Sequence, residues 1–355
     1  MSALTVEHDL VHYEALGRGR PVILVHGWLG SWRYWIPAMQ QVSGKYRTYA
    51  LDLWGFGESA KEPRLYSFEA QVRLLEQFME RLGIAKAALV GHGLGAAIVT
   101  RLALRAPERV PRLMAVSPPL FHLPPPPEPP VPLTPAESGL LPLPIDSEAE
   151  TIGLRTEEMN ARLRAALERE AQRRAAAISP APEPPAPRPN PLRERLETLD
   201  PVALLTRHAD PGANLDKLLV EVRKADPVAV AQSIETLAGV DTLRELQKLR
   251  APALAVYGSA DTLLPAPDDA MLSALRDGGH PFHAIEMRGL RHFPMLDDIA
   301  AFNRLLMDFL EAADPTGVTI KARWERRGAR GAAPTPPGPQ GPAPRGPGLP
   351  LPFLP

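Results

Sequence analysis

The distribution of proline divides this chain before any motif is considered. Most of the 43 prolines fall in three tracts, at residues 118–144, 180–191 and 315–355. Proline fixes the backbone angle φ and lacks a main-chain N–H, so such tracts exclude helix interiors and central strands. A sizeable core is therefore expected from the two stretches outside them, 1–117 and 236–312.

Both stretches alternate short apolar runs with amphipathic segments. The runs indicate buried parallel strands, and the segments between them repeat apolar residues at helical spacing. Strands are expected at 21–27, 46–53, 87–91, 112–116, 252–258 and 282–287, and helices at 68–82, 94–105 and 299–310. This alternation predicts the α/β class with one doubly wound, mostly parallel sheet.

The region between the two stretches, 118–235, is predicted to be an insertion. A segment rich in Ala, Leu, Glu and Arg at 151–178 and shorter pieces at 201–208 and 214–224 indicate helices. We interpret the insertion as a helical lid on proline-stiffened arms. The tail, 313–355, is expected to be disordered. Its PxxP matches could bind a protein partner with an aromatic groove, although a flexible extension is the simpler interpretation.

Composition excludes several classes of function. The net charge is −1, which gives no electrostatic reason to expect nucleic acid or an anionic membrane as partner. The chain has no cysteine, so disulfides, thiolate zinc sites and cysteine nucleophiles are excluded. The first residues show no signal-peptide pattern, and no apolar run is long enough to span a membrane. We expect a cytoplasmic protein without a metal or a cofactor.

The turn between the third expected strand and its helix has the sequence Gly91-His92-Gly93-Leu94-Gly95. In the G-x-S-x-G nucleophile elbow, such a turn presents the central side chain above the sheet at the helix N-terminus. The outer glycines allow strand and helix to pass closely. Here the frame is intact but its centre is Gly93, so covalent acyl transfer through this position is excluded.

Further parts of a hydrolytic site follow in chain order. The first expected strand ends in His26-Gly27-Trp28-Leu29-Gly30, and a main-chain N–H of this loop, with that of Leu94, could form an oxyanion hole. Asp261 and His292 directly follow two successive strands, and the carboxyl ends of strands are where catalytic groups gather. Taken separately, an aspartate in a turn or a lone histidine is more often structural. Their joint placement favours an acid–base pair.

These motifs, together with Asp52-Leu-Trp-Gly-Phe-Gly-Glu-Ser59, resemble the α/β-hydrolase superfamily. The similarity is to the subgroup with lidded esterases, haloperoxidase-like enzymes and C–C hydrolases, and it covers roughly residues 4–117 and 236–312. The family carries Ser at the elbow centre, or Asp in dehalogenases and epoxide hydrolases. The departure at Gly93 therefore preserves the fold and puts hydrolysis in question.

The resemblance also implies roles for individual residues. Asp261 would be the triad acid and His292 the base, and the main-chain N–H groups of Trp28 and Leu94 would be the oxyanion donors. An apolar ligand or an ester-like substrate is expected. Trp32 and Trp35 are expected to act partly as packing residues. The predicted pocket residues are Trp54, Phe56, Phe293 and Met295.

Four other side chains near the expected site carry a group that could replace the missing serine. Ser31, Ser117 and Ser259 lie near the expected site, but each is more plausibly a turn or cap hydroxyl. His92 projects from the elbow, where packing or a structural hydrogen bond is the simpler role. The segment 52–59 is expected to be a structural turn, because it lacks the lysine of a phosphate-binding loop.

Three hypotheses follow for function. The first is a pseudoenzyme of hydrolase ancestry that binds a small apolar ligand or a protein partner. The second is an enzyme in which Asp261 and His292 act as a general base without a covalent intermediate, as a hydrolase, a lyase or a cofactor-free oxygenase. The third is a degraded or deliberately mutated serine hydrolase whose relatives cleave esters.

Overall fold

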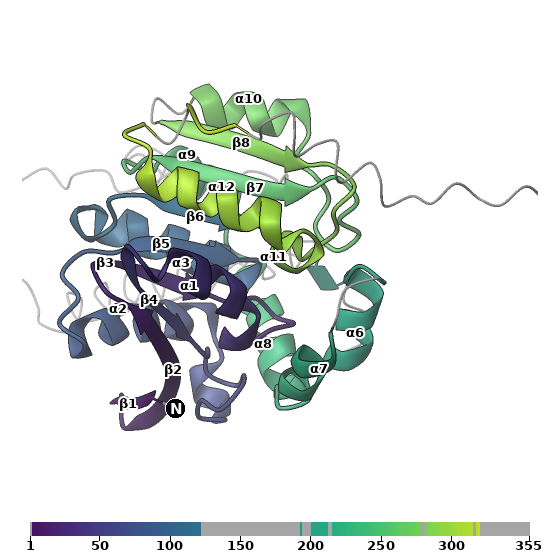
Figure 1. The fold of residues 1–355 in the computed structure, drawn as a ribbon. Coiled ribbons are helices and arrows are strands. Elements are labelled where there is room, and N and C mark those ends of the chain that lie inside the picture. The colour runs from purple at the N-terminus through teal and green to yellow at the C-terminus, as the bar shows by residue number, and fades with distance from the viewer. Residues whose placement is uncertain are drawn as a thin grey trace, which may run out of the picture. The chain divides into compact units, whose positions relative to one another are not determined.

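A single mixed sheet organises the computed structural model, which describes residues 2–121, 192–193, 200–211, 215–277, 281–314 and 317–319 (Figure 1). The strand order is β1-β2-β4-β3-β5-β6-β7-β8. β3 to β8 are parallel, whereas β1 and β2 add an antiparallel hairpin. The strands are β1 Ser2–Val6, β2 Asp9–Gly17, β3 Arg20–Val25, β4 Tyr46–Leu51, β5 Ala88–His92, β6 Leu113–Val116, β7 Ala253–Gly258 and β8 Phe282–Met287.

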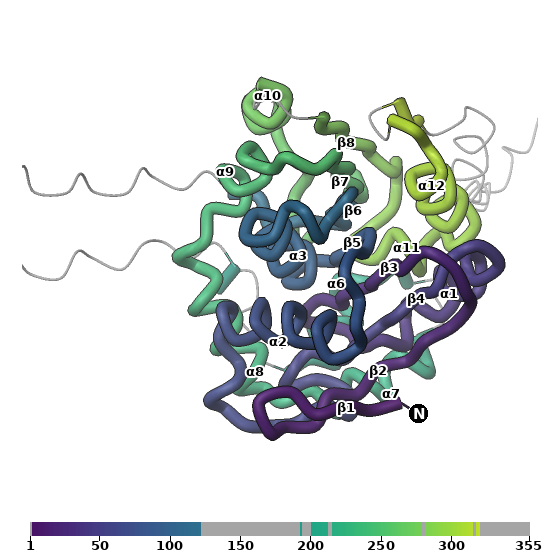
Figure 2. Tube along the Cα trace, turned by 90° about the vertical axis from the view of Figure 1, so that its left-hand side faces the viewer, coloured from purple at the N-terminus to yellow at the C-terminus, as the bar shows by residue number. Residues whose placement is uncertain are grey.

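Helices cover both faces of this sheet, as the predicted doubly wound fold requires. Figure 2 shows α1 and α12 on one side of the strands and α2, α3 and α9 on the other. The short α11 precedes α12, and α10 packs against β8 and α9. The helices are α1 Ile36–Val42, α2 Phe68–Arg81, α3 Leu94–Arg105, α9 Thr242–Gln247, α10 Asp269–Asp277, α11 Pro294–Asp297 and α12 Ile299–Glu311.

Local sequence signals explain where the longer helices begin and end. Ser67 caps α2, with its side chain accepting a hydrogen bond from the main-chain N–H of Ala70. Gly83, with φ of 65°, ends the same helix. Phe78 on the inner face is fully buried, and burial of such a side chain is worth about 1.5–3 kcal/mol. The amphipathic pattern therefore fixes which face of α2 meets the sheet.

Three further helices are described in the second half of the predicted insertion and just beyond its end. They are α6 Pro201–His208, α7 Asp216–Val222 and α8 Pro227–Leu237, and Figure 1 shows α6 and α7 beyond the carboxyl ends of β7 and β8. Asp226 caps α8, and its main-chain N–H also donates to Gly55 O at 2.8 Å. Tyr66 Oη donates to the Asp226 carboxylate at 2.7 Å. These bonds join α8 to loops of the core.

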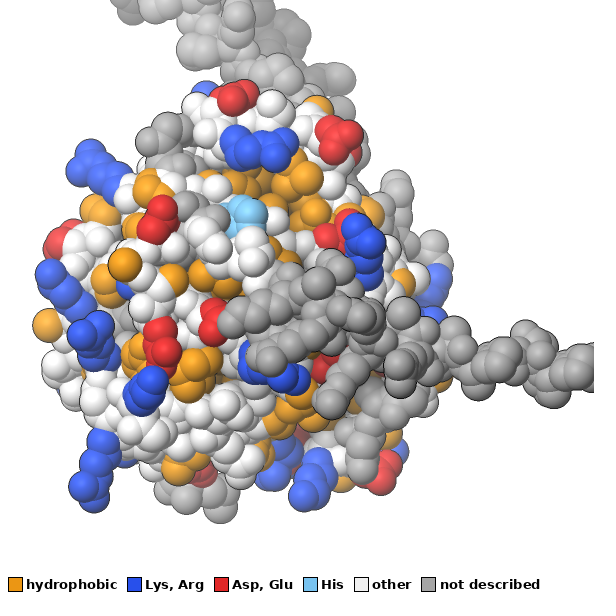
Figure 3. Space-filling view, turned by 45° about the horizontal axis from the view of Figure 1, so that its top comes forward, with side chains coloured by type: hydrophobic (Ala, Val, Ile, Leu, Met, Phe, Trp, Pro, Cys, Tyr) orange, Lys and Arg blue, Asp and Glu red, His pale blue; other side chains and the backbone are white. Residues whose placement is uncertain are grey.

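The structure describes only part of the predicted insertion and little of the predicted tail. The pieces expected at 201–208 and 214–224 correspond to α6 and α7, and α8 runs across the predicted boundary at residue 235. The helix expected at 151–178, the proline arms and nearly all of the tail lie outside the described residues. None of the described helices is long and apolar enough to cross a membrane. On the face seen in Figure 3, basic side chains are interspersed with acidic and apolar ones.

Candidate active site

The three glycines of the elbow have different steric surroundings. A Cβ on Gly91 would lie 2.3 Å from Gly95 O, and one on Gly95 would lie 2.4 Å from Val25 O, so neither position accepts a side chain. A Cβ on Gly93 would meet nothing closer than the Trp28 ring at 3.4 Å, an ordinary van der Waals contact. Of the three glycines, only Gly93 therefore has room for a side chain.

The backbone of the elbow is held in a conformation that favours glycine. Gly93 has φ of 53° and ψ of −114°, and its N–H donates to Val116 O at 2.9 Å. A residue with a side chain would pay about 1–3 kcal/mol to remain in such a region. Glycine avoids this cost. The sharp strand-to-helix turn of the G-x-S-x-G motif is thus retained, without its nucleophile.

The predicted acid and base are hydrogen-bonded to each other. His292 Nδ1 lies 2.8 Å from Asp261 Oδ2, and both side chains are buried. Asp261 Oδ1 accepts the main-chain N–H groups of Leu263 and Leu264, at 2.8 and 2.9 Å. Burial alone would raise the pKa of Asp261, but the charge of His292 and these hydrogen bonds outweigh it and lower the pKa.

An ionised Asp261 fixes the tautomer of its partner. Because a carboxylate only accepts, the proton of a neutral His292 imidazole sits on Nδ1, which leaves Nε2 as the basic atom. Within the described part of the chain, Nε2 has no hydrogen-bond partner. The arrangement can therefore take a proton from a bound molecule.

His92 has a structural role beside this pair. Its Nε2 lies 2.8 Å from His292 O, which only accepts, so this nitrogen carries the proton. Its Nδ1 then accepts from Tyr34 Oη at 3.0 Å, and that hydroxyl accepts the N–H of Gly27 at 2.7 Å. Burial, followed by the charge of His292, lowers the pKa of His92 well below its usual value. A neutral His92 thus links the oxyanion loop to the backbone of the base.

None of the three serines takes the place of a nucleophile. Ser117, at the end of β6, has φ of 43°, and its Oγ donates to His292 O at 3.3 Å. Ser31 Oγ accepts from Arg33 N at the start of the 3-10 helix at Trp32–Trp35, and Ser259 Oγ accepts from Gly289 N. Each hydroxyl fixes a loop, as turn and cap residues do.

The expected oxyanion donors flank the elbow. Among the residues that the structure describes, no hydrogen-bond acceptor meets the main-chain N–H of Trp28 or of Leu94. Leu94 is the first residue of α3, where main-chain donors have no partner inside the helix. The Trp28 indole N–H donates to Ser233 Oγ at 3.1 Å, which attaches the oxyanion loop to α8.

The predicted pocket residues are all buried. The Phe293 ring lies 5.0 Å from that of His292, and the Phe56 ring lies 5.3 Å from that of His26. Gln71 holds both main-chain groups of Trp54, accepting from its N at 3.1 Å and donating to its O at 2.8 Å. These apolar side chains surround the loops of the site, and their contact with a ligand remains a prediction.

The turn that contains Asp52 is structural, as expected. The fully buried carboxylate of Asp52 accepts main-chain N–H groups of Trp32 at 2.8 Å and Glu58 at 3.1 Å. It also lies 2.8 Å from His12 Nδ1. Ser59 Oγ donates to Asp52 O at 2.7 Å and closes the turn.

Sequence reasoning missed two ionisable residues beside the base. His208, from α6, lies 2.8 Å from Thr262 Oγ1 through Nδ1, and burial, then the charge of His292, lowers its pKa to about 4. Asp297 accepts Arg291 N at 2.8 Å, and its pKa is raised to about 6, mainly by burial. Asp297 follows His292 closely in the sequence, whereas no local pattern marks His208.

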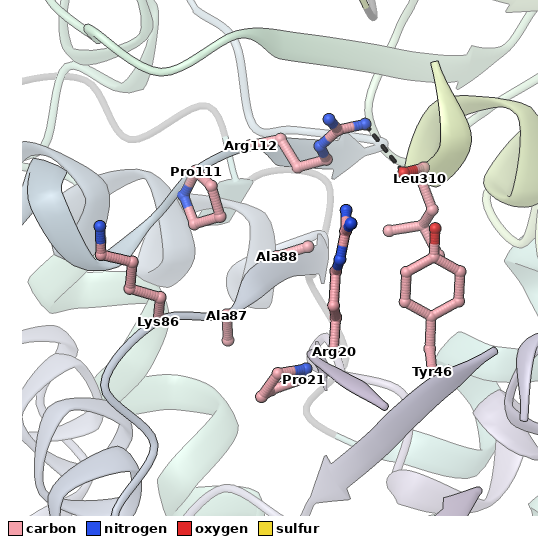
Figure 4. A pocket seen from close by; sticks show the side chains of 9 residues that line it. All are labelled: Arg20, Pro21, Tyr46, Lys86, Ala87, Ala88, Pro111, Arg112 and Leu310. Atoms are coloured by element: carbon pink, nitrogen blue, oxygen red, sulfur yellow. Dashed lines mark hydrogen bonds between the residues drawn. The ribbon is translucent and has the colours of Figure 1, made fainter. Parts of the chain in front are cut away.

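A hollow of about 290 Å³ lies at the other end of the sheet from Asp261 and His292 (Figure 4). Its lining includes Arg20, Tyr46 and Ala88, which begin β3, β4 and β5, so it opens at the amino ends of the strands. Arg112 in its wall donates to carbonyls at the end of α12. This hollow is separate from the acid–base pair. Within the described residues, no cluster of three or more His, Asp or Glu could hold a metal ion.

Comparison with known proteins agrees with this geometry. The sequence model of the α/β hydrolase fold matches residues 20–178. The chain is 36% identical over 117 residues to bifunctional epoxide hydrolase 2 of Sus scrofa, which covers 31% of this chain and 20% of that protein. It therefore spans about a fifth of the length of that relative. It is 26% identical over 263 residues to pimeloyl-(acyl-carrier protein) methyl ester esterase of Aliivibrio salmonicida. That match covers 72% of this chain and 79% of the esterase.

Solved structures share the fold at low sequence identity. A serine-to-glycine variant of N-acyl homoserine lactonase, in complex with N-hexanoyl homoserine lactone, has a TM-score of 0.58 and 20% identity, covering 87% of this chain and 96% of that one. The fold is that of the α/β hydrolases, and the match of the family model over residues 20–178 and the two relatives support the same superfamily for this chain.

Proposed function

We propose that this protein binds an acyl compound, such as an ester or a lactone, without forming a covalent intermediate with it. The observation that carries this proposal is the state of the elbow. Gly93 keeps the backbone conformation and the space of a nucleophile position, but it has no side chain. A triad without its nucleophile loses on the order of a millionfold in turnover.

The groups that would recognise an acyl ligand support this proposal. The Trp28 and Leu94 N–H groups flank the elbow and would bind a carbonyl oxygen. Asp261 is hydrogen-bonded to His292, whose ring lies 4.6 Å from that of His92 in the elbow, and the predicted pocket side chains are buried. The relative from Aliivibrio salmonicida is an esterase, and the serine-to-glycine lactonase variant holds its lactone in the same fold.

A second candidate function is hydrolysis by general base catalysis. It is favoured by one observation, the unpaired Nε2 of a His292 that Asp261 holds in the basic tautomer. In this reaction Nε2 takes a proton from water while the water oxygen adds to the ligand carbonyl. The tetrahedral intermediate then expels an alcohol, which takes the proton back from the imidazolium.

One set of variants tests both candidates. The parent protein, Gly93→Ser and Gly93→Ala are compared for hydrolysis of short-chain p-nitrophenyl esters, labelling by a fluorophosphonate and calorimetric binding of N-hexanoyl homoserine lactone. We expect the parent to bind the lactone and to escape labelling. Gly93→Ser should be labelled and should cleave esters at least about 100-fold faster than the parent.

The alanine variant is the matched control, because it carries the same backbone strain as serine without the hydroxyl. It should neither gain hydrolysis nor be labelled. In the parent, His292→Gln should abolish any slow hydrolysis if the general base mechanism operates. Labelling of the parent, ester turnover at ordinary enzyme rates, or a complete failure to bind acyl compounds would each contradict the proposal.

A further inference from the structure

His208 brings a second imidazole to the site from a different part of the chain. It is the last residue of α6 and is only 2% exposed. Its Nδ1 lies 2.8 Å from the hydroxyl of Thr262, the residue that follows the acid of the pair. Arg291, which precedes His292 in the sequence, donates to Ala209 O at 3.2 Å. The end of α6 is therefore held by two hydrogen bonds, one from His208 and one at Ala209.

The other ring nitrogen of His208, Nε2, is buried and has no hydrogen-bond partner among the residues that the structure describes. Some other buried atoms without hydrogen bonds are compensated by charge, since His12 Nε2 lies 3.7 Å from Glu14 and Arg33 Nε lies 3.1 Å from Glu221. His208 Nε2 takes part in no ion pair within the described residues. Because an unpaired buried polar group is destabilising, a bound molecule that reached this nitrogen beside the acid–base pair would be stabilised by a hydrogen bond to it.

The protonation state of His208 decides what that partner can be. Burial is the main cause that opposes a proton on this ring, and the charges of His292, Arg207 and Arg291 add to it, so the pKa of His208 falls to about 4. Asp261 acts in the other direction but more weakly than His292. At neutral pH the ring therefore has one donor and one acceptor nitrogen. When the Thr262 hydroxyl donates to Nδ1, Nε2 carries the proton and donates.

We infer that His208 Nε2 is a ligand-binding group, which donates a hydrogen bond to a second oxygen of the acyl ligand. The first oxygen is the carbonyl that the elbow and oxyanion loop would bind. The inference rests on the proposed function, and it narrows the ligand to acyl compounds with a further acceptor, such as an amide or a second carbonyl. It makes His208 a specificity-determining residue.

Two substitutions test the hydrogen bonds of the two His208 ring nitrogens one at a time. In His208→Asn the amide can replace Nδ1 and keep the bond to Thr262, but nothing reaches the place of Nε2. In His208→Gln the longer side chain can replace Nε2 instead. Calorimetry compares two probes of equal chain length, N-hexanoyl homoserine lactone and α-heptyl-γ-butyrolactone, which lacks the amide. The measured quantity is the ratio of their dissociation constants.

We expect His208→Asn to weaken binding of the amide probe about tenfold relative to the heptyl probe. His208→Gln should keep the ratio closer to that of the parent. Binding of the heptyl probe and the thermal melting temperature report whether each variant is folded. Perturbation of the His208 Nε2 resonance in ¹⁵N NMR spectra of the parent, on addition of the amide probe only, is a readout that needs no substitution.

The outcomes distinguish this inference from the proposed function. If the parent binds both lactones and His208→Asn leaves their ratio unchanged, with no perturbation of Nε2, the inference is wrong and the proposed function stands. If the parent binds neither lactone, both are overturned.

Discussion

The molecule contains two buried His–Asp pairs with the same geometry and different surroundings. His292 Nδ1 lies 2.8 Å from Asp261, and His12 Nδ1 lies 2.8 Å from Asp52. His12 is on the antiparallel strand β2 and Asp52 follows β4. A hydrogen-bonded His–Asp pair is therefore not by itself a sign of function in this fold.

The difference lies in what the remaining atoms of each pair meet. Asp52 accepts main-chain N–H groups with both of its oxygens, and these bonds hold the turn at 52–59 and the start of the 3-10 helix. Asp261 takes its two main-chain bonds on Oδ1 alone, which leaves Oδ2 for His292. One carboxylate stabilises loops, and the other is arranged to orient an imidazole at the elbow.

The largest expected difference is in chemistry. In the Gly93→Ser background, His292→Gln should lower kcat for p-nitrophenyl esters by at least about 10⁴-fold, because the new serine then has no base. His12→Gln in the same background should change kcat by less than about threefold, measured below the melting temperature of the variant. A loss with His12→Gln comparable to that with His292→Gln would show that the two pairs are not functionally distinct.

For stability, we expect the larger loss at the His12–Asp52 pair and the smaller loss at the Asp261–His292 pair. In Asp52→Asn, either orientation of the amide places its NH₂ group against a main-chain N–H, so we expect a loss of about 3 kcal/mol in the free energy of unfolding. In Asp261→Asn, the amide oxygen can keep both main-chain bonds while the NH₂ donates to His292 Nδ1. The loss there should be about 1 kcal/mol. Urea unfolding measures both values, and equal losses would contradict this reading of the carboxylates.

The sequence predicts elements whose signals are local and misses those set by distant contacts. The helix α2 was expected from Ser67, its apolar spacing and Gly83, and all three signals act within a few residues. The hairpin β1–β2 was not expected. Its turn places Glu7 and His8 at positive φ, without the Asn-Gly or Asp-Gly signal that marks such turns.

The same distinction applies to the site. Asp261 and His292 could be predicted because each lies a few residues past the end of a strand, and the carboxyl ends of parallel strands lie at the same end of the sheet. His208 could not, because its place beside them depends on where α6 packs and on its bond to Thr262. Sequence position gave His12 no special signal, because its partner comes from a strand that pairs with β2 only in the folded sheet.

The two pairs should also respond to pH in opposite directions. The bond and charge of Asp52 outweigh burial and raise the pKa of His12 above 6.5. Its contribution to stability is therefore fully present below pH 6.5 and is lost as pH rises through the folded-state pKa. The pKa of Asp261 is lowered below 3.8, so its contribution is present above pH 3.8 and is lost as pH falls further.

Unfolding free energies of the parent, His12→Gln and Asp261→Asn between pH 3 and 9 test these signs. The difference in unfolding free energy between the parent and His12→Gln should shrink at high pH, and that between the parent and Asp261→Asn should shrink at low pH. Parallel curves for the parent and either variant would contradict the assignment for that pair.

The smallest expected effect concerns Asp297, a buried carboxyl group that is hydrogen-bonded to the residue before His292. Its pKa is raised from 3.8 to about 6, mainly by burial, with the charge of Asp210 adding to the shift. The unfolded chain therefore ionises first as pH rises, so this group lowers stability between pH 3.8 and 6 and stays unfavourable above that range. In Asp297→Asn the amide oxygen can still accept the Arg291 N–H, and the NH₂ group takes the place of Oδ1, which has no hydrogen-bond partner among the described residues. The variant should be more stable than the parent by roughly 1 kcal/mol at pH 7.5 and equally stable at pH 4. A destabilised variant at pH 7.5 would mean that the charge itself is needed to hold the loop of the base.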